Sequence, residues 1–371
     1  MLEKLKIKGK LLKELDVWTI IIAIIIVLFG AINIYSATRL KTGTSYLKLQ
    51  IIWLIIGLAI LYFILIFDYS VIMNYSSLIY WASIIFLLIN DTLGKVTNGA
   101  RSWIALGSRG IQPSEFAKIA MIIMLAKKLE DMEGNINNLK NFFILCFYAL
   151  VPMALIVIQP DMGMTMVCFF IVLGIFFMAG LNLKIIIGGI GSVVALVAIG
   201  WNSPFMQLYW KDRLTSFLNP AKDELGSGLQ LLSSLTGIGS GGILGKGFLK
   251  GTQISGGFIP EAHTDFIFAV VGEEWGLVGA AFLLILYGLL LYRFIKIAKS
   301  SKDIFGSIIC SGIIATTLFS ILQNIGMTIG IMPITGITLP LMSYGGSSIL
   351  TNFIAIGLIL NIGMRKKKIN F

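Results

Sequence analysis

The sequence is poor in charged residues and in cysteine, and it contains a single histidine. Only 13% of its 371 residues are charged, whereas 57% are apolar, and the mean hydropathy is +0.91. Because an ordinary soluble domain has about 45–50% apolar and about 25% charged residues, this composition excludes a water-soluble globular protein. The three cysteines lie in apolar runs at no spacing typical of metal ligands, so neither a disulfide framework nor a zinc site is indicated.

Long uncharged apolar runs, bounded by Gly, Pro, Asn or charged residues, fill most of the chain. Several exceed the roughly 18 residues that a helix needs to cross about 30 Å of hydrocarbon. We therefore predict an all-α polytopic membrane protein with one integral membrane domain, residues 1–371. Ten spans are expected, near residues 16–38, 46–67, 71–90, 113–127, 141–158, 162–180, 184–202, 265–292, 304–326 and 346–364.

The basic residues indicate the orientation of these spans. With a cytoplasmic N-terminus, 17 Lys and Arg lie on the cytoplasmic side and 6 in the short outer loops, as the positive-inside rule requires. The expected topology has cytoplasmic basic tails at residues 1–15 and 365–371, and a large extracellular loop at 203–264 between spans 7 and 8. The net charge of +11 is thus a topology signal and an attraction to anionic lipids, and it does not imply a nucleic-acid partner.

Most of the unusual polar and glycine-rich sequence falls in three segments expected on the outer side. These are residues 98–118, 237–265 and 333–348. Polar backbone at membrane depth is tolerated only where it is buried in protein or lines a wet cavity. The segments therefore favour one shared external site, although three independent solvent loops would have the same composition.

The first segment places ionisable residues at the start of an apolar span. Pro113 is typical of a helix start, and Glu115 would lie in its first turn, where the helix dipole favours an acid. Glu115 and Lys118 are three apart, so an intrahelical ion pair that only neutralises itself is one interpretation. The other is functional, because an ionisable group in a span usually faces the bundle interior. Arg101 has the planar group that suits phosphate oxygens, and Trp103 could lie against a sugar ring or at the membrane interface.

The second segment combines glycines with two acids and the single histidine. Residues 236–247 contain no ordered phosphate loop, so the glycines indicate flexibility and close approach to a bulky ligand. Glu261 and Asp265 would share a helix face if a helix begins at Pro260. Three apolar residues follow Asp265, and desolvation there would raise its pKa and suit it to accept a proton. The single histidine, His263, is given only a supporting role.

The third segment is broken by prolines and glycines. Its Ser/Gly run, which includes Ser343 and Ser347, can present backbone N–H groups to an anion, and a re-entrant packing element explains the pattern equally well. Glu273 and Glu274 lie deeper in the span after the second segment. They are interpreted either as buried partners of a basic residue or as catalytic groups.

Six blocks of these residues resemble the SEDS family (shape, elongation, division and sporulation), whose members build the bacterial cell wall. The blocks occur in family order and are NGARSW at 98–103, QPSEFAK at 112–118, QPD at 159–161, PEAHTDFIF at 260–268, GEE at 272–274 and LPLMSYGGSS at 339–348. Ten spans with cytoplasmic ends also match the family. The short tails favour the elongation branch over the division and sporulation branches.

The resemblance implies a peptidoglycan glycosyltransferase of the bacterial cytoplasmic membrane. It would polymerise lipid II, a disaccharide-pentapeptide on undecaprenyl pyrophosphate, at the outer face. The attacking sugar hydroxyl needs a base, and the departing pyrophosphate needs positive charge or a metal ion. Asp265 is the candidate base, and Arg101, Lys118 and Lys246 are the candidate cations. A divalent cation, Mg²⁺ or Mn²⁺, at Asp265 or Glu261 is left open.

Two competing functions are a lipid II flippase and a non-catalytic scaffold. A flippase needs alternating access, whereas the polar signals lie on one side, and a scaffold has no need for an acid among apolar residues. The resemblance also implies protein partners, namely a class B penicillin-binding protein with transpeptidase activity and other membrane proteins of the elongation complex.

Overall fold

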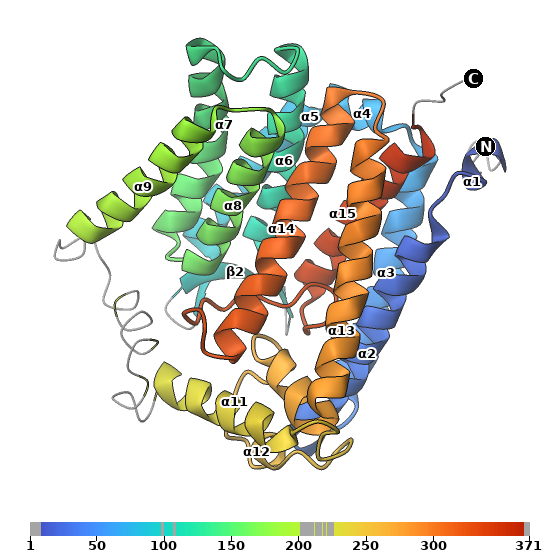
Figure 1. Ribbon diagram of the computed structural model, residues 1–371, viewed down its shortest axis with the longest axis vertical. Helices are drawn as coiled ribbons and strands as arrows, with labels where there is room; N and C mark the ends of the chain where they lie inside the picture. The colour runs from blue at the N-terminus through green and yellow to red at the C-terminus, as the bar shows by residue number, and fades with distance from the viewer. Residues whose placement is uncertain are drawn as a thin grey trace.

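In the computed structural model the chain forms a bundle of long helices that run side by side (Figure 1). The structure describes residues 9–97, 100–106, 109–200, 211, 217, 220 and 226–366. The helices are α1 (Gly9–Leu12), α2 (Val17–Thr42), α3 (Ser45–Ile66), α4 (Tyr69–Asn74), α5 (Ser76–Leu93), α6 (Pro113–Asp131), α7 (Leu139–Ile158), α8 (Met162–Met178), α9 (Leu183–Gly200), α11 (Ser227–Gly241), α12 (Thr252–Ser255), α13 (Ile267–Lys299), α14 (Ile304–Thr328) and α15 (Gly346–Met364).

The ten expected spans all coincide with helices, and the polytopic helical membrane architecture is confirmed. One expected span, 71–90, is divided between the short α4 and α5. Seven of the described helices are long and apolar enough to cross a membrane; α5 and α8 are shorter apolar helices, and α6 carries several charges. The number of helices that cross the membrane stays a prediction.

Local sequence explains where several helices begin. Asp161 caps α8 by accepting a hydrogen bond from the backbone N–H of Met164, and Asp303 caps α14 in the same way through Gly306. Pro113 occupies the first turn of α6, where the missing N–H costs nothing, as the sequence predicts. These starts fix the ends of the helices that surround the site.

The helices differ in how deeply they are buried. In α14 and α15, 72% and 78% of the apolar window is buried, whereas none of α9 is. Figure 1 shows α9 leaning away from the other helices. The helices α14 and α15 therefore form the centre of the bundle, and α9 presents apolar side chains on all sides, as a helix in contact with lipid does.

The two ends of the bundle hold different parts of the chain. The short α1 and the last turn of α15 lie at one end, and α11 and α12 lie across the other (Figure 1). Before α6, β1 (Lys95–Thr97), β2 (Ala100–Leu106) and β3 (Arg109–Ile111) form an antiparallel sheet in the order β1-β2-β3. This sheet was not predicted from the sequence, because β1 and β3 have only three residues each and the seven residues of β2, ARSWIAL, do not alternate between polar and apolar.

The glycine-rich second segment contains the end of α11, up to Gly241, and the short α12, and its other residues form turns and loops; its expected flexibility stays a prediction. Its glycines let two backbones meet: a Cβ at Gly241 would lie 2.0 Å from the carbonyl oxygen of Gly272 in α13, and one at Gly276 would lie 2.4 Å from the nitrogen of Gly245. The close approach thus joins α11 to α13 rather than to a ligand. Within the expected loop, residues 203–210, 212–216, 218–219 and 221–225 lie outside the described residues.

Candidate functional site

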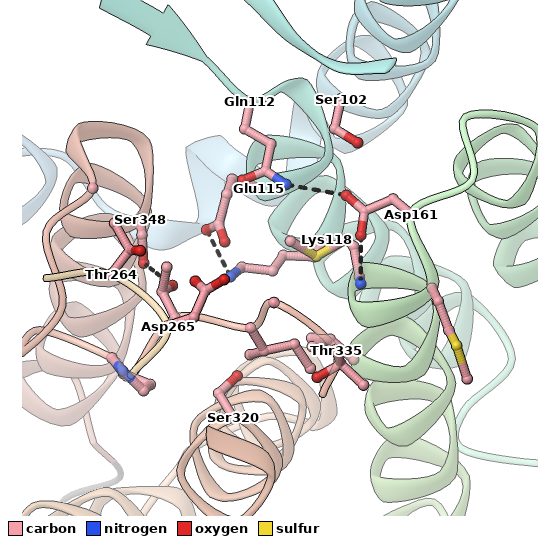
Figure 2. Close-up of a pocket in the computed structure, with 18 of the residues that line it drawn as sticks. Ser102, Gln112, Glu115, Lys118, Asp161, Thr264, Asp265, Ser320, Thr335 and Ser348 are labelled. Carbon is pink, nitrogen blue, oxygen red and sulfur yellow. Dashed lines mark hydrogen bonds and ion pairs between the residues drawn. The ribbon is translucent and has the colours of Figure 1, made fainter. Parts of the chain in front are cut away.

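A polar cavity of about 280 Å³ lies inside the bundle, among α6, α8, α14, α15 and the turns that precede α13 and α15 (Figure 2). All three expected outer segments line it, so the expectation that they share one site is confirmed. The polar residues of its wall are Ser102, Gln112, Glu115, Lys118, Asp161, Glu261, Thr264, Asp265, Thr316, Ser320, Thr335, Thr338, Tyr344, Ser348 and Asn352.

Lys118 and Glu115 form a buried ion pair in the cavity wall. The Lys118 Nζ lies 2.7 Å from Glu115 Oε2, and their side chains are only 8% and 6% exposed. The same carboxylate oxygen accepts a hydrogen bond from Thr351 Oγ1 of α15 at 2.6 Å. The pair expected from the i, i+3 spacing is therefore present. Because taking two charges out of water is costly, a buried pair at a cavity wall is a candidate for a functional role.

No helix begins at Pro260. Residues 260–266 form turns, in which the backbone N–H groups of Thr264 and Phe266 donate to the Glu261 carbonyl, and α13 begins only at Ile267. Glu261 and Asp265 therefore share no helix face. They reach the same cavity through the fold of the turn instead.

Asp265 lies on the side of the cavity opposite the start of α8, and its backbone is anchored. Asn324 of α14 donates from Nδ2 to the carbonyl oxygens of Asp265, at 2.8 Å, and of Ile337, at 2.7 Å. Figure 2 shows the Asp265 carboxylate and the Lys118 amine pointing toward each other, with Glu115 on the other side of Lys118. An acid and a cation from segments far apart in the chain thus face the same space.

Asp161 is a further acid in the cavity wall, and it was not among the candidate site residues predicted from the sequence. Its carboxylate accepts hydrogen bonds from Gln112 Nε2 at 3.1 Å and from the backbone N–H of Met164 at 3.0 Å. Burial raises the pKa of this carboxyl above its usual value and outweighs the hydrogen bonds, which lower it. An acid directly after Pro160, at the start of an apolar span, was the sequence signal for it.

Ser343 and Ser347 lie behind the cavity wall rather than in it. Ser343 donates from Oγ to the carbonyl of Thr264 at 2.6 Å, and Ser347 Oγ accepts from the backbone N–H of Gln112 at 3.1 Å. Both side chains are buried. Their contacts tie the third segment to the other two, so the positions predicted to bind substrate are occupied by residues that hold the wall together.

His263 also lies beside the cavity. Its carbonyl accepts from the backbone N–H of Tyr344, and its ring lies against the rings of Tyr46 and Tyr344 at 5.0 and 5.9 Å. Burial lowers the pKa of the imidazole below its usual value, so the ring is neutral at pH 7. This agrees with the supporting role given to it.

Lys246 does not line the cavity, in contrast to the prediction. Its Nζ lies 2.7 Å from Glu273 Oε1 in α13, and Thr252 donates to the same oxygen from its backbone N–H at 2.8 Å. The lysine is thus part of the junction that attaches α11 and α12 to α13. Glu273 is the buried partner of a basic residue, which was one of the two interpretations for it.

Arg101 is placed only in part. Its backbone belongs to β2, and its side chain lies outside the described residues. Its neighbours Ser102 and Trp103 both line the cavity. The indole ring of Trp103 is therefore available at the wall, where a sugar ring could lie against it.

The described residues do not form a metal site of their own. No three His, Cys, Asp or Glu side chains come together in the described part of the chain. Magnesium is nevertheless often held by one or two carboxylates together with phosphate oxygens of a substrate. Asp265 and Glu261 both line the cavity, and a cation shared between them and a substrate stays a prediction.

Comparisons with known proteins extend over nearly the whole chain. The family described as "Cell cycle protein", which covers FtsW, RodA and SpoVE, matches residues 15–368. The stage V sporulation protein E of Bacillus subtilis is 36% identical over 94% of this chain and 96% of its own length. The peptidoglycan glycosyltransferase MrdB of Escherichia coli is 35% identical over 96% and 95%.

A solved structure has the same fold. It is described as "Structural coordination of polymerization and crosslinking by a peptidoglycan synthase complex", and one of its chains matches with a TM-score of 0.82 and 30% identity. The match covers 94% of this chain and 97% of that one.

Proposed function

The chain belongs to the FtsW/RodA/SpoVE family of cell cycle proteins, which is the SEDS family, and we propose from this premise that it polymerises lipid II as a peptidoglycan glycosyltransferase. The relative from Escherichia coli bears the name of that activity. The reaction would take place at the outer face of the bacterial cytoplasmic membrane, with both termini in the cytoplasm.

The observation that carries the proposal is that Asp265 and Lys118 line the same cavity (Figure 2). A growing glycan needs a base at the attacking hydroxyl and a cation at the leaving group, a few ångströms apart. The turn before α13 supplies the first and α6 supplies the second. Glu115 holds the lysine in place from the opposite side.

In the proposed step, the C4 hydroxyl of the acceptor sugar attacks the anomeric carbon of the donor. The new β-1,4 C–O bond forms as the bond between the anomeric carbon and the pyrophosphate oxygen breaks. The hydroxyl proton passes to the Asp265 carboxylate, and the undecaprenyl pyrophosphate leaves with the bonding electron pair. Lys118 stabilises the negative charge that develops on the pyrophosphate. One carboxylate suffices, since pyrophosphate leaves without being protonated.

A divalent cation is compatible with this arrangement. Asp265 and Glu261 would hold it together with pyrophosphate oxygens, and it would supply positive charge to the leaving group. The protein's own residues still orient the acceptor and remove its proton.

The proposed partner is a class B penicillin-binding protein, which would crosslink the glycan as it is made. The likeness to a chain of a peptidoglycan synthase complex supports a shared assembly. We assign the chain to cell elongation, with other membrane proteins of the elongation complex as further partners. Cells that lose this protein should become round, and long filaments would instead point to division.

The central experiment compares two cavity carboxylates in polymerisation of purified lipid II. The protein is assayed in detergent with its partner, whose transpeptidase is blocked, and glycan chains are separated on a gel. Asp265→Asn should lower the rate by about 10² to 10⁴, the usual loss for a general base. Glu261→Gln, in the same cavity, is the matched control and should lower it by less than about tenfold.

Each result of this experiment has a definite meaning. Near-wild-type polymer from Asp265→Asn removes the aspartate from the mechanism, and the larger loss in Glu261→Gln would make Glu261 the base. Detergent offers no two membrane faces between which a flippase could move lipid II, and a flippase would form no polymer. Absence of polymer from the wild type under varied partners and metals would therefore favour transport. Activity that is indifferent to both substitutions would favour a scaffold.

A further inference from the structure

A second cavity lies at the end of the bundle that holds α1 and the last turn of α15. Its volume is about 390 Å³, and it lies where the start of α2 meets the last turns of α13 and α15. It is separate from the site described above, with which it shares no residue. The charged residues of its wall are Lys13, Glu14, Asp16, Arg293, Lys296 and Lys366.

The wall carries more positive than negative charge. Four of its residues are basic and two are acidic. Both acids are paired: Asp16 accepts from Arg293 Nε at 2.8 Å, and Glu14 Oε2 lies 2.9 Å from Lys366 Nζ.

Two lysines remain after this pairing. Lys13 and Lys296 are exposed at the wall, and within the part of the chain that the structure describes neither forms an ion pair with a carboxylate. Two ammonium groups beside a cavity can hold an anion, because they stabilise a negative group that enters and no acid among the described residues forms an ion pair with either of them.

Apolar and aromatic side chains continue from the cavity along the two helices. On α2, Trp18 is exposed, as are Ile21 and Ile25, which lie three and seven residues further along the same helix face. Tyr292 and Leu289 follow the same pattern on α13, four and seven residues before Lys296. Trp and Tyr at such positions are typical of the boundary between headgroups and acyl chains.

A basic cavity with apolar helix faces directly below it matches an amphiphilic anion better than a soluble one. We propose that this cavity binds the phosphate headgroup of an anionic phospholipid, with Lys13 and Lys296 as the phosphate ligands and the exposed faces of α2 and α13 against the acyl chains. The site would belong to the membrane leaflet on the side of α1. The proposal is independent of the glycosyltransferase activity.

Lipid binding can be measured directly by native mass spectrometry of the full chain released from detergent. The probes are phosphatidylglycerol and phosphatidylcholine with identical acyl chains. The test variant is Lys13→Gln/Lys296→Gln. The matched control is Lys140→Gln/Lys184→Gln, since these lysines are exposed, begin α7 and α9 at the same end of the bundle and do not line the cavity.

The wild type should retain phosphatidylglycerol in preference to phosphatidylcholine. Removal of two charges at the cavity should weaken phosphatidylglycerol binding by about 25-fold, since each basic residue contributes a factor of about five. The control variant should stay within about twofold of the wild type. Lys13→Arg/Lys296→Arg should restore binding, which separates loss of charge from loss of fold.

Three results would overturn the proposal. Equal retention of both lipids by the wild type would show that no anionic headgroup is selected. An equal loss in the cavity and control variants would reduce the effect to general surface charge. Displacement of bound phosphatidylglycerol by millimolar inorganic phosphate would identify the ligand as a soluble phosphate and not a lipid.

Discussion

Two lysine–glutamate pairs in this protein have the same separation and different surroundings. Lys118–Glu115 and Lys246–Glu273 are each 2.7 Å apart. Glu273 also accepts hydrogen bonds from the backbone N–H groups of Thr252 and Gln253, at 2.8 and 2.9 Å. The Glu273 carboxylate therefore attaches the backbone of α12 to α13.

The pair at Lys118 has a different environment. It lines the cavity, and apart from the lysine the contact of Glu115 is the hydroxyl of Thr351 on a neighbouring helix. The distance between two charges therefore does not reveal their role. A carboxylate saturated by backbone donors stabilises the fold, whereas a pair that faces a cavity remains available to a ligand.

The largest expected effect is the difference in activity between substitutions of the two lysines. Lys118→Met should lower polymerisation at least about 100-fold, since it removes the charge that faces the leaving group. Lys246→Met should leave polymerisation within about threefold and lower the free energy of unfolding by about 1–3 kcal/mol, because Glu273 keeps its backbone donors. Glycan synthesis and thermal unfolding are measured in the same detergent.

The double variant Glu115→Gln/Lys118→Met separates activity from stability. Replacing both members of a buried pair is often close to neutral for stability, whereas removing one leaves an uncompensated charge. We expect this variant to unfold near the wild-type temperature and to remain inactive. Full activity of Lys118→Met would mean that the Lys118–Glu115 pair is a structural contact, as the Lys246–Glu273 pair is.

The junction of α11 and α13 can be tested through its glycines. A Cβ at Gly241 would lie 2.0 Å from the Gly272 carbonyl oxygen, so Gly241→Ala should lower the free energy of unfolding by about 1–3 kcal/mol. Gly239, two residues earlier in the same helix, has no neighbour within 4 Å of such a Cβ. Gly239→Ala should therefore raise stability by about 0.5–1 kcal/mol. Equal effects in thermal unfolding would contradict the close approach.

A smaller effect is expected at the hydroxyl that contacts Glu115. Thr351→Val keeps the shape of the side chain and removes the donor, which should lower the free energy of unfolding by about 1–2 kcal/mol. Thr317→Val is the control, because the Thr317 hydroxyl donates only to the Ile313 carbonyl within its own helix. Polymerisation should fall for the first variant and not for the second. The reverse order would mean that Thr351 does not position the pair.

The smallest predicted effect concerns His263 beside the cavity. Burial lowers its pKa in the folded protein, so the unfolded chain binds the proton more readily. Stability should therefore fall as the pH decreases through about 6.5 and level off below the folded pKa. Since this is the only histidine, its imidazole resonance can be followed alone by NMR. His263→Gln should remove that part of the pH dependence. A pKa of His263 above 6.5 in the folded protein would contradict the prediction.

Much of the architecture could be predicted from local pattern. Apolar runs predicted the positions of the long helices, and Pro113 predicted the start of α6. The sequence also indicated that residues 98–118, 237–265 and 333–348 belong together. In each case the signal is local, because it depends on hydrophobicity or on the conformational limits of one residue type.

Other features required the packed molecule. Lys118 and Lys246 are both lysines near polar, glycine-containing sequence, and only the fold shows that one faces the cavity and the other the junction. Asp161 entered the site because α8 begins at the cavity wall. The turn at residues 260–266 replaced an expected helix because its backbone is held by Ser343 and Asn324 from distant segments.

Composition and the order of the motifs are enough to identify a polytopic helical membrane protein of one family, because neither depends on how the helices are arranged. Which ionisable groups share a space follows only from the packing of the helices. The first cavity joins residues more than two hundred positions apart, among them Glu115 and Ser348. The second cavity, which is basic, joins the first turn of α2 to the last turns of α13 and α15. Periodicity gives the face of a helix that is apolar; it cannot give the neighbour against which that face packs, because that depends on the free energy of the whole bundle.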